Sequence, residues 1–240
     1  MTAAALIQHQ HTANQAAHGI IAERHICRNN TALIIIDMQR DFLDPRGYAS
    51  KAGLDVSHLR KVIPSVSRLL ACARNLEMLV IYTREGHLPD LSDCPPVKLE
   101  RSRIAGAEIG SAGPLGRLLI RGQSGHDIIR ELQPLLYEQI VDKPGYGAFH
   151  QTDLEQMLKI LNIHNLLICG VTTEICVHST LREAIDRGYS CTLVADACGS
   201  AFPELHAAAL KMVAVEGGIF GRVTDTKSIL AELEKSQVET

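Results

Sequence analysis

The chain has 240 residues, of which 46% are hydrophobic, and its 24 basic residues are nearly balanced by 27 acidic ones. This length fits one large α/β domain, and a net charge of −3 excludes the basic surface expected of a protein that binds nucleic acid or an anionic membrane. No apolar run approaches the roughly 20 residues of a membrane span, and we expect no secretory signal within the first 30 residues. The seven cysteines form no CxxC pair and show no zinc-type spacing with histidine, so we expect reduced thiols in a cytoplasmic protein.

The predicted elements alternate between strands and helices along most of the chain. Residues 1–30 are polar and include four histidines; metal binding is the alternative to the extended arm that we predict here, and residues 31–240 are predicted to form a single domain. Apolar runs predict strands at 32–36, 78–83, 139–142, 166–170 and 191–195, and a short final strand from 217–220. Helices are predicted at 57–75, 127–132, 152–161, 174–188, 203–215 and 226–234. The order predicts an α/β fold: a doubly wound, six-stranded, mainly parallel sheet with helices on both faces.

Residues 88–126 interrupt this alternation with a stretch rich in proline and glycine. Long segments with few regular features are usually functional or contact a partner. We therefore expect this segment to form a wall of an active site and part of a subunit interface.

Three chemically complementary side chains follow predicted strands. Asp37 comes after the first strand, Lys143 after the third, and Cys176 shortly after the fourth. Because the carboxyl ends of parallel strands share one edge of the sheet, these residues are predicted to converge on one crevice. There the cysteine would be a nucleophile, the aspartate a proton acceptor, and the lysine a cation that stabilises a thiolate and orients the carboxylate.

The turn at residues 170–176 (GVTTEIC) leaves two interpretations of Cys176 open when it is considered alone. A cysteine in the first turn of a helix is favoured as thiolate by the helix dipole and by free backbone N–H groups, but small buried cysteines also pack strand–helix junctions. The presence of Asp37 and Lys143 decides for the nucleophile. The backbone N–H groups between Thr172 and Cys176 would then supply an oxyanion hole. Cys169, Cys191 and Cys198 are predicted to be packing residues.

Three sequence blocks carry a resemblance to a known family: residues 33–42 (LIIIDMQRDF), 142–144 (DKP) and 170–177 (GVTTEICV). In this order they resemble the isochorismatase-like cysteine hydrolases, over most of the chain. The resemblance implies an Asp-Lys-Cys triad that works without a cofactor, here Asp37, Lys143 and Cys176. It also implies a non-proline cis peptide bond, which would be Val171–Thr172.

The residues after the second strand indicate which branch the chain resembles. Nicotinamidases of the family hold a metal there with an aspartate and two closely spaced histidines, whereas residues 83–90 (TREGHLPD) contain one histidine, so no metal site is predicted. Isochorismatases of siderophore pathways lack a cysteine at the position of Cys176, which favours amide hydrolysis here. Residues 83–91 and 113–129 are most similar to the biuret hydrolase branch, and ureidoacrylate amidohydrolases are close relatives of it.

Two positions depart from the biuret hydrolases at sites that face the substrate in that branch. Tyr146 stands in place of a lysine, and Glu216 in place of a glutamine. The changes remove a cation and add an anion, which argues for a neutral ureide with many N–H donors. We therefore predict hydrolysis of a terminal C–N bond of a small linear ureide, biuret or triuret, through a covalent acyl-enzyme that releases ammonia. Ureidoacrylate or another carbamoyl amide is the alternative substrate.

The predicted substrate contacts each have a structural alternative. The contacts are Phe42, His87, Tyr146, Thr173 and Glu216. Phe42 is predicted to stack on a planar substrate or to pack in the core, and His87 to contact substrate or to be a solvated loop residue. Glu216 is predicted to bind substrate N–H groups or to cap a helix.

Two other classes of function were weighed. No G-x-G-x-x-G follows the first strand and no Walker-A stretch occurs, which argues against a nucleotide-binding module. A catalytically inactive scaffold is disfavoured by the intact triad. The predicted partners are therefore a small ureide and water, with neither nucleic acid nor membrane, in a homo-oligomer for which the resemblance favours a tetramer.

Overall fold

The structure is a computed structural model that describes residues 26–236. The predicted N-terminal arm falls almost wholly outside the described residues and stays a prediction. None of the helices in the described part is both long and apolar enough to cross a membrane.

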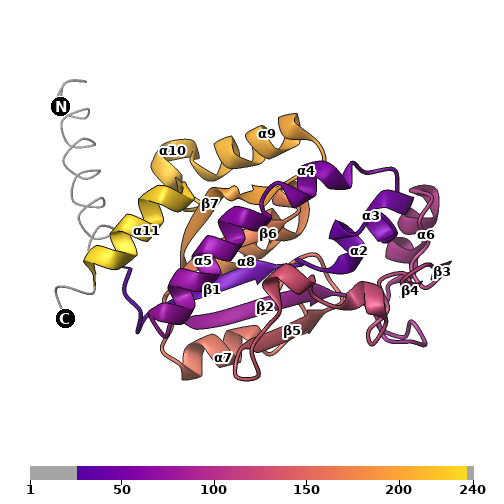
Figure 1. Ribbon diagram of the computed structural model, residues 1–240, viewed down its shortest axis with the longest axis horizontal. Helices are drawn as coiled ribbons and strands as arrows, with labels where there is room; N and C mark the ends of the chain where they lie inside the picture. Colours follow the sequence, from indigo (N-terminus) through magenta and orange to yellow (C-terminus); the bar gives the residue numbers. More distant parts are fainter. Residues whose placement is uncertain (1–25, 237–240) are drawn as a thin grey trace, which may run out of the picture.

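Six parallel strands form the central sheet, in the order β5-β2-β1-β6-β7-β8 (Figure 1). The strands are β1 (Thr31–Ile36), β2 (Leu79–Glu85), β5 (Gln139–Lys143), β6 (Asn165–Val171), β7 (Ser190–Gly199) and β8 (Arg222–Thr224). β1 lies at the centre, fully buried between β2 and β6. The predicted fold class is confirmed, and the carboxyl ends of all six strands share one edge.

Helices cover both faces of the sheet. They are α2 (Arg40–Leu43), α3 (Tyr48–Lys51), α4 (Val56–Arg60), α5 (Ile63–Asn75), α6 (Pro96–Ile104), α7 (Leu154–Ile160), α8 (His178–Asp186), α9 (Pro203–Val213), α10 (Val215–Gly218) and α11 (Thr226–Lys235). Short elements complete the chain: η1 (Ser124–His126), η2 (Arg130–Leu132), η3 (Thr173–Val177), β3 (Ala112–Gly113) and β4 (Gly116–Arg117). In Figure 1, α5 and α11 cross the near face of the sheet, where they contact each other.

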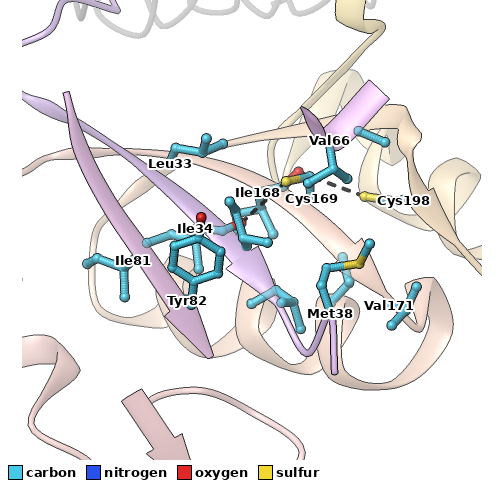
Figure 2. Close-up of a cluster of buried hydrophobic side chains, with 14 of the residues drawn as sticks. Leu33, Ile34, Met38, Val66, Ile81, Tyr82, Ile168, Cys169, Val171 and Cys198 are labelled. Carbon is cyan, nitrogen blue, oxygen red and sulfur yellow. Dashed lines mark hydrogen bonds between the residues drawn. The ribbon is translucent and has the colours of Figure 1, made fainter. Parts of the chain in front are cut away.

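The core is an apolar layer on the central strands. Figure 2 shows Leu33 and Ile34 of β1 beside Ile81 and Tyr82 of β2, with Ile168 of β6 nearby. A fully buried run of β-branched and leucine side chains is typical of a strand covered on both faces. This packing fixes the strands in register, so that the residues at their carboxyl ends are held rigidly.

The predicted packing cysteines belong to this core. Cys169 and Cys198 are buried, and their thiols point to the carbonyl oxygens of Ile34 and Ile168 at 3.7 and 3.8 Å (Figure 2). Burial raises the pKa of both thiols far above that of an exposed cysteine. All seven cysteines, each of them within the described residues, are unpaired in the structure.

Two predicted elements differ in the structure because of local backbone requirements. The helix predicted at 57–75 is two helices, α4 and α5, since Pro64 is favoured in the first turn of a new helix and unfavourable inside one. The final strand starts at Arg222 and not at 217, because Glu216 and Gly217 have φ of 52° and 77° and form a turn within α10.

The structure also differs from the sequence prediction at residues 88–126 and 127–132. Residues 88–126 contain the helix α6, whose buried side chains, Lys98 and Ser102, are polar. The apolar periodicity that would predict a helix is therefore missing from α6. The helix predicted at 127–132 is reduced to the single 3-10 turn η2.

Candidate active site

The triad residues come from three strand ends at the carboxyl edge of the sheet. Asp37 directly follows β1 and has a left-handed backbone, with φ of 48°. Lys143 is the last residue of β5. Cys176 lies in η3, a π-helical turn between β6 and α8. The peptide bond Val171–Thr172, where β6 ends, is cis, as the resemblance implies.

Asp37 and Lys143 form a buried ion pair. The Lys143 Nζ is 2.8 Å from the Asp37 Oδ2, and both side chains are fully buried. Lys143 also donates hydrogen bonds of 3.0 Å to the carbonyl oxygens of Gly145 and Tyr146, while the Thr83 hydroxyl donates to the Asp37 Oδ1 at 2.6 Å. Buried charges persist when they are paired and their other valences are hydrogen-bonded, as they are here.

Cys176 is held between two carboxylates. Its thiol donates to the Oε2 of Glu85 at 3.2 Å. Carboxylate oxygens of Asp37 and Glu85 and the Cys176 sulfur all lie within 4.8 Å of one another. Cys176 is 4% exposed, so a reacting group would meet its thiol largely out of water.

Glu85 is a site residue that the sequence analysis did not assign. It is the last residue of β2, two residues beyond the predicted end of that strand, and it lies opposite Lys143 in the register of β2 and β5. The signal was available, since a polar residue at the carboxyl end of a central parallel strand lies where ligands bind.

Lys98 is a second unassigned site residue, carried in by α6. Its Nζ is 2.7 Å from the Glu85 Oε1 and donates to the carbonyl oxygen of Pro144 at 2.6 Å. The same ammonium lies 4.8 Å from the ring centroid of Tyr146. A cation therefore occupies the surroundings of Tyr146 although the lysine of the biuret branch is missing from that position.

Burial and neighbouring charges shift the pKa values of the titratable groups of the site in different directions. Burial raises the pKa of Cys176 well above that of an exposed thiol, and Lys143 only partly opposes this effect. Burial also raises the pKa of Asp37. Burial acts in the same direction on Glu85, but Lys98 and Lys143 outweigh it and lower its pKa. Burial acts to lower the pKa of Lys143, yet Asp37, Cys176 and Glu85 raise it overall. The resting thiol is therefore neutral, and Glu85 is the carboxyl group whose ionised form the two lysines favour.

Two tyrosines lie near enough to Cys176 to interact with it electrostatically. Tyr146 is 40% exposed. Tyr48 is half-buried, and burial together with the charges of Glu85 and Cys176 raises its pKa to about 12. Tyr48 was not singled out from the sequence. Phe42 is 8% exposed and makes an edge-to-face contact with the Tyr48 ring at 6.0 Å, which fits the packing alternative for Phe42.

The other predicted contacts lie in different surroundings. His87 is fully buried, with its Nδ1 3.2 Å from the Asp93 Oδ1, so the solvated-loop alternative is wrong. Burial lowers the pKa of His87. Thr173 is buried, and its hydroxyl is 2.8 Å from the His206 Nδ1. The roles of His87 and Thr173 as substrate contacts, and of the Thr172 and Cys176 N–H groups as oxyanion hole, stay predictions.

Glu216 lies in the segment that follows α9. His206, in the first turn of α9, contacts the cysteine turn through Thr173. Glu216 is ten residues further along the chain, on α10, where its backbone is left-handed with φ of 52°. The residue is exposed. A substrate contact by Glu216 therefore stays a prediction.

One group of potential metal ligands occurs within residues 26–236: Asp37, Glu85 and Cys176. Both carboxylates already have an ammonium partner, Lys143 for Asp37 and Lys98 for Glu85. A third cation between them would be repelled by these two lysines. We therefore assign the cluster to proton handling.

Comparison with known families identifies this arrangement. The family described as "Isochorismatase domain" matches residues 31–228. The chain belongs to the isochorismatase family. The match spans every strand of the central sheet and all three triad residues. The site described above therefore lies within the matched domain.

Curated relatives match over most of the chain. It is 31% identical over 211 residues to the ureidoacrylate amidohydrolase RutB of Acinetobacter baylyi, covering 86% of this chain and 85% of the relative. It is 32% identical over 210 residues to the RutB protein of Serratia proteamaculans, covering 82% and 80%.

Solved structures share the fold. A cysteine hydrolase from Pseudomonas syringae pv. phaseolicola has a TM-score of 0.75 and 26% identity, covering 88% of this chain and 96% of its own. N-carbamoylsarcosine amidase from Thermoplasma acidophilum has a TM-score of 0.63 at 21% identity, covering 82% and 96%, which shows likeness of fold alone.

Proposed function

We propose that this protein is a cysteine amidohydrolase that cleaves a terminal C–N bond of a small, neutral linear ureide of the biuret or triuret type and releases ammonia. The observation that carries the proposal is the buried Cys176 thiol beside Asp37 and its partner Lys143. A nucleophile, a proton acceptor and a charge-fixing cation are the parts that acyl transfer through a thioester requires.

The reaction would run in two halves. Asp37 takes the Cys176 proton as the sulfur attacks the terminal carbamoyl carbon, and backbone N–H groups of the turn receive the oxyanion. Asp37 then protonates the leaving nitrogen, and ammonia departs from an acyl-thioester. Water, deprotonated by Asp37, attacks that carbonyl, and the released sulfur recovers its proton. Lys143 keeps Asp37 in place throughout, because it is anchored by two carbonyl oxygens as well as by the carboxylate.

Charge balance supports a neutral substrate. The two ammonium groups of the site are each paired with a carboxylate, Lys143 with Asp37 and Lys98 with Glu85. Arg84 and Arg121, near the same edge, are paired with Asp142 and Asp93. A substrate carboxylate would have to displace one of these partners, whereas a ureide can hydrogen-bond without doing so.

Ureidoacrylate, or a related carbamoyl amide, is the second candidate substrate. It is favoured by the names of the relatives that match 82–86% of the chain. The cation at Lys98 also weakens the argument from Tyr146 alone, because the site retains positive charge there.

The deciding experiment is ammonia release from biuret, triuret, ureidoacrylate and nicotinamide at equal concentration. We expect the highest kcat/KM with biuret or triuret and none with nicotinamide. A preference for ureidoacrylate would replace the proposed substrate and keep the mechanism. Inactivity on all four, together with no alkylation of Cys176, would favour the inactive scaffold.

A further inference from the structure

We propose that Glu85 and Lys98 form a second ion pair of the catalytic centre, in which Glu85 holds the Cys176 thiol in place and Lys98 holds Glu85. This inference rests on the proposed function in assigning Cys176 as the nucleophile. It adds a catalytic residue, Glu85, which touches the reacting sulfur, and a positioning residue, Lys98, which acts through it.

Each oxygen of the Glu85 carboxylate has its own partner. Oε1 is 2.7 Å from the Lys98 Nζ, and Oε2 accepts the hydrogen bond from the Cys176 thiol at 3.2 Å. The Lys143 Nζ is 3.7 Å from the same Oε2. Such a division fixes the carboxylate plane, because neither oxygen can turn without losing a charged or hydrogen-bonded contact.

Lys98 is itself fixed from three directions. It bonds to Glu85, donates to the Pro144 carbonyl oxygen and lies against the face of Tyr146. Its side chain is 9% exposed, far less than a lysine that serves only solubility. Because Pro144 directly follows Lys143, the Lys98 contact also ties α6 to the strand end that carries the first ion pair.

The two carboxylates then have different tasks. Glu85, beside two ammonium groups, stays ionised and accepts the S–H bond in the resting state. Asp37 accepts the proton when the sulfur attacks. The proton reaches Asp37 once the S–H bond rotates about Cβ–Sγ away from Glu85, because a carboxylate oxygen of Asp37 also lies within 4.8 Å of the sulfur.

The titratable groups that act on the thiol come from several elements. They are Asp37 after β1, Tyr48 on α3, Glu85 on β2, Lys143 at the end of β5 and Tyr146 three residues later. Lys98 on α6 is paired with Glu85. Asp37 and Glu85 disfavour the thiolate, and Lys143 favours it. Replacing Glu85 by a neutral group of the same shape therefore favours the thiolate while it removes the acceptor that orients the thiol.

The test compares the wild type with Glu85→Gln, using peptide mass spectrometry to follow the rate of iodoacetamide alkylation of Cys176 between about pH 7 and 11, a range that reaches above the pKa of an exposed thiol. We expect the alkylation midpoint to fall by about one pH unit, the shift typical of losing a nearby like charge. Ammonia release should fall at least about tenfold, which corresponds to one misplaced hydrogen bond at the nucleophile. An unchanged midpoint in a folded variant would overturn the proposal, since a merely structural pair would lower stability without changing thiol ionisation.

Two further variants keep this test decisive. Glu85→Gln/Lys98→Gln removes both charges together, so a folding defect caused by an unpaired Lys98 is avoided. We expect a downward shift of the midpoint that is smaller than in Glu85→Gln, because loss of the Lys98 cation partly offsets loss of the Glu85 anion, which is nearer to the sulfur. Arg103→Gln removes an exposed cation from the same helix and should leave both readouts unchanged. Alkylation needs no substrate, so failure of the proposed ureide activity would leave the midpoint comparison intact.

Discussion

The two ion pairs of the site differ in how the fold delivers them. Asp37 directly follows β1 and Lys143 is the last residue of β5, and neither side chain has any exposed surface. Glu85 also lies at a strand end, but its partner Lys98 is carried by α6, within a segment that sequence patterns describe as irregular. The first pair is therefore a product of sheet topology, and the second depends on a covering segment. This difference predicts which substitutions disable the centre and which adjust it.

The largest effect is expected for Cys176→Ser. The serine hydroxyl is a far weaker nucleophile here, because a carboxylate such as Asp37 is too weak a base to remove its proton readily. Ammonia release should fall by about 10³-fold or more, with an unchanged thermal unfolding midpoint. Substantial residual turnover by the purified variant would contradict the acyl-enzyme mechanism.

Lys143→Met should combine loss of activity with loss of stability. It leaves the fully buried Asp37 carboxylate without its cation, and breaking a buried pair in this way costs about 3–5 kcal/mol. Urea denaturation measures the free energy of unfolding. Lys143→Met/Asp37→Asn, which removes both charges, is the matched control and should recover part of the lost stability while staying inactive.

Lys98→Met should also lower the free energy of unfolding, but by less than Lys143→Met. Glu85 would keep a cation, because the Lys143 Nζ is 3.7 Å from its Oε2. We expect a loss of about 1–3 kcal/mol in unfolding free energy, comparable to a hydrogen bond to a charged group. If Lys98→Met proved as destabilising as Lys143→Met, the two pairs would not differ in the way described.

The smallest expected effect is a displacement of the pH–rate profile. Burial and the charge of Glu85 raise the pKa of Asp37, and Asp37 must be ionised to accept the thiol proton. Activity should therefore rise with pH through a value above the ordinary aspartate pKa, and the acid limb of kcat/KM should move to lower pH in Glu85→Gln. An acid limb that stays in place in that variant would show that Glu85 does not act on Asp37.

The triad could be predicted from the sequence because the ends of buried strands can be recognised there. The apolar runs before Asp37 and Lys143 mark buried strands, and parallel topology then determines that these residues meet. The same reasoning did not reach Glu85, because the predicted strand ended at Thr83, whereas the hydrogen-bonded pairing of β2 with β5 continues to Glu85.

Lys98 and Tyr48 were beyond the reach of the patterns used. α6 buries a lysine and a serine, so its inward face has no apolar stripe, and its start at Pro95 and Pro96 resembles a loop. Tyr48 lies on a helix of four residues, too short for periodicity to show. The role of Glu216 stays a prediction for another reason: a role transferred by position in a related branch does not specify where α10 places the residue relative to Cys176.

The left-handed backbone of Asp37 bears on how this protein can lose its activity during evolution. At φ of 48°, a β-branched side chain is strained, whereas asparagine and aspartate tolerate that conformation. Most replacements at position 37 would therefore be removed by selection for stability before selection for turnover acts. Asparagine matches the shape and the backbone, but it accepts no proton and leaves the buried Lys143 ammonium without its counter-ion. The route from a working hydrolase to a folded, inactive paralogue therefore runs through paired changes at positions 37 and 143, which remove both buried charges together.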